Sequence, residues 1–209
     1  MLSSSIIILS VLLPSVDAPG RAQHENPLPV ISAYDEVIQK HASRYQMDWR
    51  LMSAIAYTES RFNPDAKSRS GALGLLQVMP ATGRELGFND VEDLESNVEA
   101  GTIYMKRLVR ILNDKIPPQE RVNFALAAYN AGLGHVYDAQ KLAREMGLNP
   151  YQWFGNVEKA IILLQKPEYA KKARYGYCRG GQPVAYVARV REMEANYRKL
   201  TGKRKKLAS

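Results

Sequence analysis

One glutamate stands where a carboxyl group could act as an acid. Glu59 follows Met52 by seven residues and Ile55 by four, so on a helix of about 3.6 residues per turn it shares their apolar face. Burial disfavours the ionised form of a carboxyl group and raises its pKa, which suits a general acid near neutral pH. Glu59 also lies near the helix end, before Asn63 and Pro64, where most glutamates are solvated. Its position alone therefore leaves a catalytic acid and a solvated side chain both open, with the solvated one the simpler interpretation.

Three further segments carry polar and aromatic side chains beside glycines. Residues 68–80, SRSGALGLLQVMP, combine two glycines, which permit close backbone approach, with the amide of Gln77. Residues 124–132, FALAAYNAG, end a predicted helix with a tyrosine and an asparagine. Residues 175–181, YGYCRGG, place two tyrosines beside an arginine. Sugar rings stack on such aromatic side chains, but core residues do so as well, and each segment alone is most simply a loop, a helix end or packed core.

Metal and nucleophile chemistry find little support in the sequence. The three histidines, His24, His41 and His135, are scattered without a partner at the spacing of metal ligands, and Cys178 has no second thiol. The sequence also contains no glycine-rich phosphate loop of a known kind. We therefore expect neither a metal nor a cofactor.

The elements that must position these residues are predicted to be helices. Apolar residues recur with helical spacing from Ile31 onward, and no stretch alternates long enough for a central strand. We expect Asp48 to cap the helix that carries Glu59, Asn97 to cap a second helix, and the two prolines from Pro117 to begin a third. Further helices, mostly bounded by a glycine or a proline, are expected over residues 134–146, 156–165 and 183–200.

Length and composition fit one folded domain. The chain has 209 residues, of which 45% are hydrophobic and 24% charged, as in an ordinary globular protein. These values exclude an intrinsically disordered, collagen-like or disulfide-stapled chain, and we expect a compact, mainly α-helical domain over residues 31–200. Twenty-nine Lys and Arg against twenty-one Asp and Glu give a net charge of +8, which suits an anionic partner without naming one.

The two ends differ from this domain. Residues 1–18 contain an apolar run, 6–13, that is shorter than the roughly 20 residues that span a bilayer, and residues 16–18, VDA, resemble a signal-peptide cleavage site. Because no Lys or Arg precedes the run, a frayed or misassigned start is the alternative. Residues 19–30 are predicted to be a linker, and residues 201–209 a solvated basic tail. We therefore expect export to the periplasm or cell envelope.

Together, in this order and at these spacings, the segments resemble the lytic transglycosylase family, whose catalytic domain is similar to goose-type lysozyme. The resemblance rests on Glu59-Ser60, on residues 74–80 (GLLQVMP), on residues 128–132 (AYNAG) and on Tyr186-Val187. It covers nearly the whole predicted domain, residues 31–197. It implies a compact, lysozyme-like helical fold.

The resemblance is strongest to the membrane-bound F type of this family, over residues 124–181. Members of that type carry a large solute-binding-like domain before the catalytic one, and we expect the residues before Ile31 to be too few to hold it. Leu76 stands where the family usually has methionine, a nearly volume-neutral change. Gln182 stands where the family often has glutamate, so a possible second carboxylate is lost.

The resemblance also implies roles for individual residues. Glu59 matches the family's catalytic carboxylate, and Tyr186 matches a tyrosine that faces it. The positions that line the glycan site in the family match Ser68, Gln77, Met79, Tyr129 and Asn130.

The implied reaction cleaves the β-1,4 bond between N-acetylmuramic acid and N-acetylglucosamine in peptidoglycan without water. Glu59 would protonate the glycosidic oxygen, and the muramoyl acetamido group would stabilise the cation in place of a second carboxylate. Glu59 would then accept the proton of the muramoyl C6 hydroxyl, which attacks the anomeric carbon and leaves a 1,6-anhydro ring. The expected partners are peptidoglycan glycan strands and not nucleic acid. Peripheral attachment to the outer membrane or cell wall is a further possibility, and the chain is expected to be a monomer.

Two other functions stay open. A goose-type lysozyme would hydrolyse the same bond and would need a second carboxylate to position water, for which Asp65, Asp90 and Glu92 are near in sequence. A basic helical module that binds glycan or nucleic acid without catalysis would account for the net charge and the basic tail alone.

Overall fold

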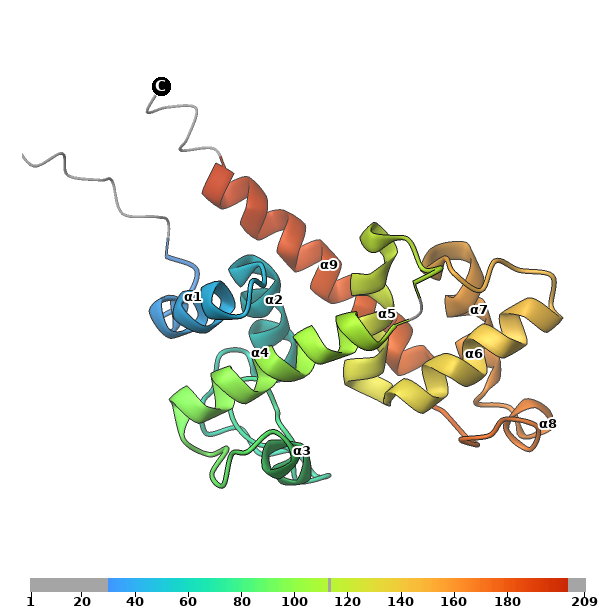
Figure 1. The fold of residues 1–209 in the computed structure, drawn as a ribbon, viewed down its shortest axis with the longest axis horizontal. Coiled ribbons are helices and arrows are strands. Elements are labelled where there is room, and N and C mark those ends of the chain that lie inside the picture. Colours follow the sequence, from blue (N-terminus) through green and yellow to red (C-terminus); the bar gives the residue numbers. More distant parts are fainter. Residues whose placement is uncertain (1–29, 113, 203–209) are drawn as a thin grey trace, which may run out of the picture.

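The computed structural model describes residues 30–112 and 114–202, and every regular element in these two ranges is helical (Figure 1). The mainly α-helical architecture expected from the sequence is confirmed. A kinked turn, η1 (Trp153–Val157), precedes α7. In chain order the α-helices are α1 (Asp35–Arg44), α2 (Trp49–Ser60), α3 (Pro80–Glu85), α4 (Leu94–Ile111), α5 (Pro118–Ala131), α6 (Leu133–Glu145), α7 (Glu158–Leu163), α8 (Pro167–Ala170) and α9 (Gly181–Gly202).

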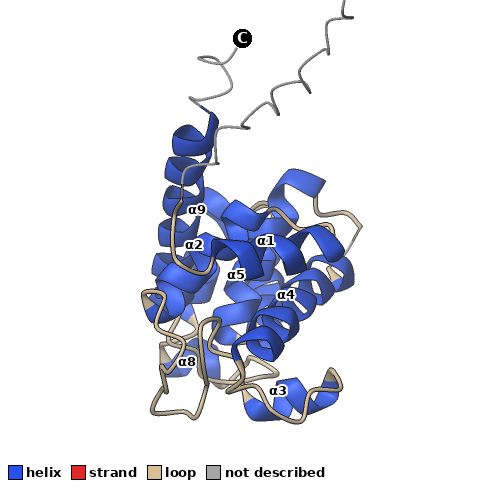
Figure 2. Cartoon of the chain, turned by 90° about the vertical axis from the view of Figure 1, so that its left-hand side faces the viewer, coloured by secondary structure: helices blue, strands red, loops and turns tan. Residues whose placement is uncertain are grey.

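The longest helix, α9, connects the two ends of the molecule. It runs from the side of α6, α7 and α8 to the side of α1 and α2, as Figure 1 shows. On its way it packs against α2 and α5, while α4 contacts α1 and α5. The loops gather at the end of the molecule where α3 and α8 lie (Figure 2). The last turns of α2 and the start of α9 are thereby held beside loops, which is where a site can form.

The core forms where the apolar faces of these helices meet. Met52 and Ile55 of α2 are fully buried, as the stripe in the sequence predicts. Phe124 of α5 packs edge-to-face on Trp153 of η1, with ring centroids 5.6 Å apart, and both rings are fully buried. Among the described residues, no helix is long and apolar enough to cross a bilayer.

The two predicted helix caps had different outcomes. The prediction for Asp48 is confirmed, because its carboxylate accepts a hydrogen bond from the backbone N–H of Arg50, 2.9 Å away. The prediction for Asn97 is wrong: α4 begins at Leu94, and Asp93 caps it by accepting from Ser96 N at 2.9 Å. Asn97 lies inside the first turns of α4, fully buried, because its amide serves a neighbouring loop instead.

The helix boundaries also differ from expectation at several points. The short helices α3 and α8 were not predicted, and α7 is shorter than the range 156–165. Thr201, expected in the basic tail, belongs to α9: it is buried, and Arg50 Nε donates to its hydroxyl over 2.6 Å. The boundary placed after residue 200 is therefore too early. The predicted signal peptide, nearly all of the predicted linker and residues 203–209 of the tail lie outside the described residues.

Candidate active site

Glu59 is the acid around which the site is built. It lies in the last turn of α2, partly buried, and Tyr186 of α9 donates its hydroxyl hydrogen to Glu59 Oε1 over 2.7 Å. Burial raises the pKa of Glu59 from 4.5 to about 7, while the hydrogen bond from Tyr186 acts in the opposite direction and limits the rise. Near neutral pH this carboxyl group therefore exists in both the protonated and the ionised form.

Tyr129, near the end of α5, is the third member of this cluster. Its hydroxyl donates to the carbonyl oxygen of Leu76 over 2.7 Å, and its ring packs on Tyr104 of α4 with centroids 5.4 Å apart. Burial raises the pKa of Tyr129 and of Tyr186 well above 10, and the charge of Glu59 raises both further. Both hydroxyls consequently stay protonated and can only donate or accept hydrogen bonds at neutral pH.

The loop that follows α2 is tied to three helices. Ser60 Oγ of α2 donates to the carbonyl of Leu75 over 2.9 Å, and Tyr129 of α5 donates to Leu76. Asn97 of α4 accepts from the backbone N–H of Leu76 over 2.8 Å. The amide nitrogen of Asn97 donates to the carbonyls of Leu73 and Val91, each over 2.8 Å. This buried amide fixes the loop beside Glu59, a role that the sequence pattern concealed behind an apparent helix cap.

Gln77 braces the same loop from within. Its side-chain Nε2 donates to the carbonyls of Ala66 and Gly74, over 3.0 and 2.9 Å. Its backbone has a φ of 48°, and Arg61 and Phe62, directly after α2, have φ values of 56° and 62°. Left-handed conformations at non-glycine residues store strain and persist only where surrounding contacts enforce them, commonly at functional sites.

The remaining predicted site residues form no hydrogen bond with Glu59 in the described part of the chain. The Ser68 hydroxyl accepts from Ala72 N over 2.9 Å and so closes a turn of the loop. Met79, directly before α3, is 39% exposed, unusual for a large apolar side chain and suited to ligand contact. Asn130 follows Tyr129 and is exposed at the end of α5.

A hollow of about 430 Å³ lies between the end of α5 and the start of α9, and its lining residues do not include Glu59, Tyr129 or Tyr186. Asn130 lines it from α5, and Gln182, one helical turn before Tyr186, lines it from α9. Tyr177 and Arg179, both exposed, lie on its rim within the glycine-rich segment that the sequence singled out. Aromatic and cationic side chains together suit an anionic, sugar-containing ligand.

Asp138 positions the aromatic segment and was missed by the sequence analysis. This buried carboxylate of α6 accepts from the backbone N–H groups of Arg174 and Tyr175, over 3.0 and 2.7 Å. Gly134 lies so close to the Tyr175 ring that a Cβ there would come within 2.4 Å of it. A lone aspartate on a helix gives no sequence signal for such a contact, because its partners are backbone groups 36 and 37 residues away.

Comparison with known protein families assigns the chain to one of them. A family model described as "Transglycosylase SLT domain" matches residues 36–151. The chain belongs to the transglycosylase SLT domain family. This confirms the family resemblance drawn from the sequence, and the matched range contains every predicted site residue except Tyr186.

Curated relatives of this SLT domain are membrane-bound lytic murein transglycosylases F. That of Shewanella woodyi is 41% identical over 166 residues, which are 77% of this chain and 34% of the relative. That of Desulfosudis oleivorans is 38% identical over 167 residues, 80% of this chain and 37% of the relative. The chain thus spans about a third of the length of these relatives.

Solved structures show the same fold. The 70 kDa soluble lytic transglycosylase of Escherichia coli matches with a TM-score of 0.57 at 25% identity, over 81% of this chain and 25% of that one. A 70 kDa soluble lytic transglycosylase in complex with bulgecin A matches with a TM-score of 0.56 at 26% identity, over the same shares. The lysozyme-like helical fold implied by the resemblance is confirmed.

Proposed function

We propose that this SLT domain cleaves the glycan strands of peptidoglycan as a lytic transglycosylase and leaves 1,6-anhydro-N-acetylmuramic acid ends. The observation that carries the proposal is the Glu59–Tyr186 pair: one carboxyl group with a pKa of about 7, 2.7 Å from a hydroxyl. The relatives are named lytic murein transglycosylases, which supports the same reaction and substrate.

The first step uses the protonated form of Glu59. Its carboxyl group donates a proton to the glycosidic oxygen between N-acetylmuramic acid and N-acetylglucosamine, and the C1–O bond breaks. The 2-acetamido group of the muramoyl residue stabilises the positive charge at C1, as substrate-assisted glycosidases do. A pKa of about 7 keeps the proton on Glu59 at near-neutral pH and still lets it leave.

The second step uses the ionised form that the first step creates. The Glu59 carboxylate accepts the proton of the muramoyl C6 hydroxyl, whose oxygen attacks C1 and closes the 1,6-anhydro ring. The two steps together consume no water, and Glu59 returns to its protonated state. Tyr186 donates to the carboxylate throughout, so its hydrogen bond is most favourable while Glu59 is charged.

The other predicted site residues are proposed to hold the substrate. Tyr129 and Gln77 are committed to the backbone of the loop and would position it against the sugar. Asn130 and Met79 are exposed and would contact the glycan directly, whereas Ser68, whose hydroxyl accepts from Ala72 N, would act through the turn that it closes.

A goose-type lysozyme activity is the second candidate, and the geometry gives it less support. Asp65 and Glu92 line a separate hollow of about 250 Å³ together with Lys67 and Gly74. The Asp90 carboxylate accepts from the backbone N–H of Glu92 in a turn. Among the described residues, Tyr186 is the group hydrogen-bonded to Glu59, and no second carboxylate contributes to the shift of the Glu59 pKa.

Mass spectrometry of the products tests the proposal. Digestion of purified peptidoglycan should give muropeptides lighter by one water than those of a lysozyme digest, because the anhydro ring forms without hydrolysis. Glu59→Gln should abolish turnover, whereas Asp65→Asn and Glu92→Gln should retain it. Hydrated products would establish the lysozyme, and an inactive Asp65→Asn or Glu92→Gln protein would contradict the single-acid mechanism.

We further propose that the chain acts in the cell envelope, where its substrate is found. The relatives are named as membrane-bound, and the predicted signal in residues 1–18 fits export. Sequencing the N-terminus of the protein recovered from cells tests this location, since export through such a signal should remove those residues.

A further inference from the structure

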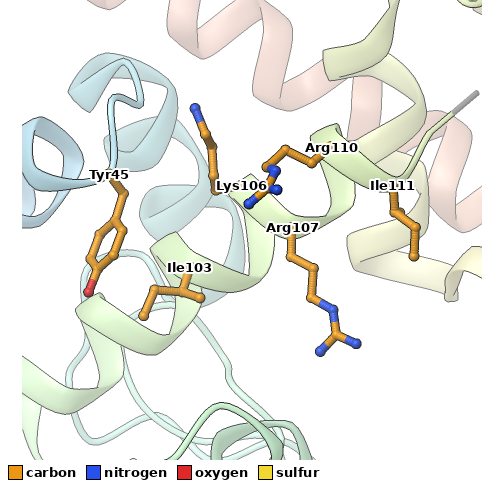
Figure 3. A pocket seen from close by; sticks show the side chains of 6 residues that line it. All are labelled: Tyr45, Ile103, Lys106, Arg107, Arg110 and Ile111. Carbon is orange, nitrogen blue, oxygen red and sulfur yellow. The ribbon is translucent and has the colours of Figure 1, made fainter. Parts of the chain in front are cut away.

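A second hollow lies on α4, apart from the Glu59 cluster. It measures about 600 Å³, within the roughly 300–1,000 Å³ range of ligand sites. Tyr45, which follows α1, closes one end, and the remaining side chains come from α4. We call it the α4 groove (Figure 3); its lining residues are Tyr45, Ile103, Lys106, Arg107, Arg110 and Ile111.

The α4 groove concentrates positive charge: three of its lining residues are cations and none is an acid, while Glu99 at its Tyr45 end is paired with Arg44. Lys106, Arg107 and Arg110 form no ion pair with another described residue, although most cations elsewhere near α1 and α4 do, such as Lys40 with Glu95. Figure 3 shows the Arg110 side chain extended along α4 toward Lys106, while Arg107 points away from both. Three uncompensated cations within two helical turns attract an anionic ligand.

Apolar side chains lie between these charges. Ile103 is partly buried, and Ile111 is 49% exposed, so the groove offers aliphatic surface as well as cations. The ring of Tyr45 adds an apolar wall, because its hydroxyl is engaged in donating to Glu99. A ligand with carboxylates and small aliphatic groups therefore complements both parts of this surface.

The geometry distinguishes a peptide from a membrane surface. A bilayer is bound by apolar side chains that protrude from a surface. Here Ile111 is exposed, but Ile103 is partly buried and the binding surface is hollow, which suits an extended chain that enters it. Successive helix residues are about 100° apart, so Ile103 faces a different direction from Tyr104, which packs on Tyr129. Arg107 and Ile111, three and seven residues after Tyr104, lie closer to its face.

We propose that the α4 groove binds an acidic peptide with small aliphatic side chains, namely the stem peptide of a peptidoglycan strand other than the one cleaved at Glu59. The choice of this peptide rests on the proposed function, whereas the cationic and aliphatic lining of the groove is independent of it. Binding here holds the domain on the wall through a neighbouring strand while the catalytic cluster remains free for its own substrate.

Nuclear magnetic resonance on the full chain tests the α4 groove. The protein is ¹⁵N-labelled and carries Glu59→Gln, and the probe is the synthetic peptide acetyl-Ala-γ-Glu-Ala-Ala, which has two carboxylates and no sugar. We expect amide shifts confined to residues 103–111 and the neighbourhood of Tyr45. Binding should weaken about tenfold in Lys106→Ser/Arg110→Ser, in keeping with two exposed charge contacts, and should weaken with added salt.

A matched variant separates a site from general charge attraction. Lys159→Ser/Lys166→Ser removes the same charge from exposed residues that line neither hollow, and it should bind the peptide as the parent does. Equal weakening in both double variants, or no shifts on α4, would overturn the proposal. So would residue-specific binding of anionic phospholipid vesicles without binding of the peptide, which would make the groove a membrane contact.

The readout is independent of catalysis. Peptide binding is measured on a protein that carries Glu59→Gln, while the proposed function is judged from the muropeptides made by the parent chain. Peptide binding with hydrated or absent products would leave the groove assigned and the proposed function wrong. Anhydro products without peptide binding would support the proposed function and overturn the assignment of the α4 groove.

Discussion

At Glu59, burial and a hydrogen bond act on the pKa in opposite directions. Burial raises it to about 7, and the Tyr186 hydroxyl, by stabilising the charged form, keeps it from rising further. In the proposed mechanism Glu59 first gives and then accepts a proton, which works best when neither form is strongly favoured. The tyrosine thus tunes the acid that burial creates.

Replacing the tyrosine should shift the pH dependence of the reaction. Tyr186→Phe keeps the ring but removes the donor, so the pKa of Glu59 should rise and the alkaline limb of the kcat/KM profile should move to higher pH. Turnover should also fall, by roughly tenfold to a hundredfold, because the carboxyl group loses its positioning contact. Tyr104→Phe, without a bond to Glu59, should leave the limb in place. A limb that moves to lower pH in Tyr186→Phe would contradict this account.

Glu59 should also make the folded protein less stable as the pH rises. Because its pKa is about 7 folded and 4.5 unfolded, the folded state holds the extra proton between these values, and the free energy of unfolding falls as pH increases through this window. Glu59→Gln should therefore stabilise the protein more at pH 8 than at pH 4, measured by urea unfolding. Glu95→Gln is the opposite control, because hydrogen bonds from His41 and Lys40 lower the Glu95 pKa. Glu95→Gln should lower the free energy of unfolding at pH 8. The same change in the free energy of unfolding for both variants would rule out this explanation.

At the scale of elements, the site exists because α9 docks on α2, α5 and α7 in one register. The start of α9 is fixed by a close approach: a Cβ on Gly180 would lie 1.9 Å from the carbonyl oxygen of Ile161 in α7. Gly181, the next residue, has nothing within 4 Å of such a Cβ. A side chain can therefore be accommodated at Gly181 but not at Gly180, although the two glycines are adjacent in the sequence.

Gly180→Ala should move the start of α9 away from α7 and lower the free energy of unfolding by about 3 kcal/mol, near the upper end for overpacking against backbone. Turnover should fall as well, since the displaced helix carries Tyr186. Gly181→Ala should change both by little, and in a helix alanine is favoured over glycine. Calorimetry with a turnover assay compares them, and similar stability of the two variants would show that α9 is not held by this approach.

At the scale of the whole molecule, the folded domain ends later than the basic composition of its last residues indicates. Thr201 is buried and accepts from Arg50 of α2, so the last turn of α9 belongs to the packed structure. Lys203 to Lys206 follow immediately, four like charges in succession. The like charges in such a run repel one another, and they can attract the chain to an anionic cell wall without taking part in the chemistry.

Truncation after Gly202 should leave turnover of a short soluble glycan unchanged and reduce activity on intact sacculi only at low salt. The Debye length falls from about 10 Å at 0.1 M to about 3 Å at 1 M, which screens the tail from an anionic wall. Truncation after Leu200 removes Thr201 as well and should lower the free energy of unfolding by about 1 kcal/mol, through the lost contact with Arg50. An equal loss on the short glycan after the first truncation would place the tail within the active domain.

The sequence by itself determined the family, the helical class and the cap at Asp48, and it singled out Glu59 as a candidate acid, because these depend on local spacing and on motifs that are contiguous in the chain. Burial of Asn97 and packing of Thr201 were decided by tertiary structure, since their partners lie far away in sequence and include backbone groups that carry no sequence signal. The pKa of Glu59 belongs to the same class. A helical stripe indicates that a carboxyl group can be buried, but only the docking of α9, which brings Tyr186 across 127 residues, sets how strongly it holds its proton.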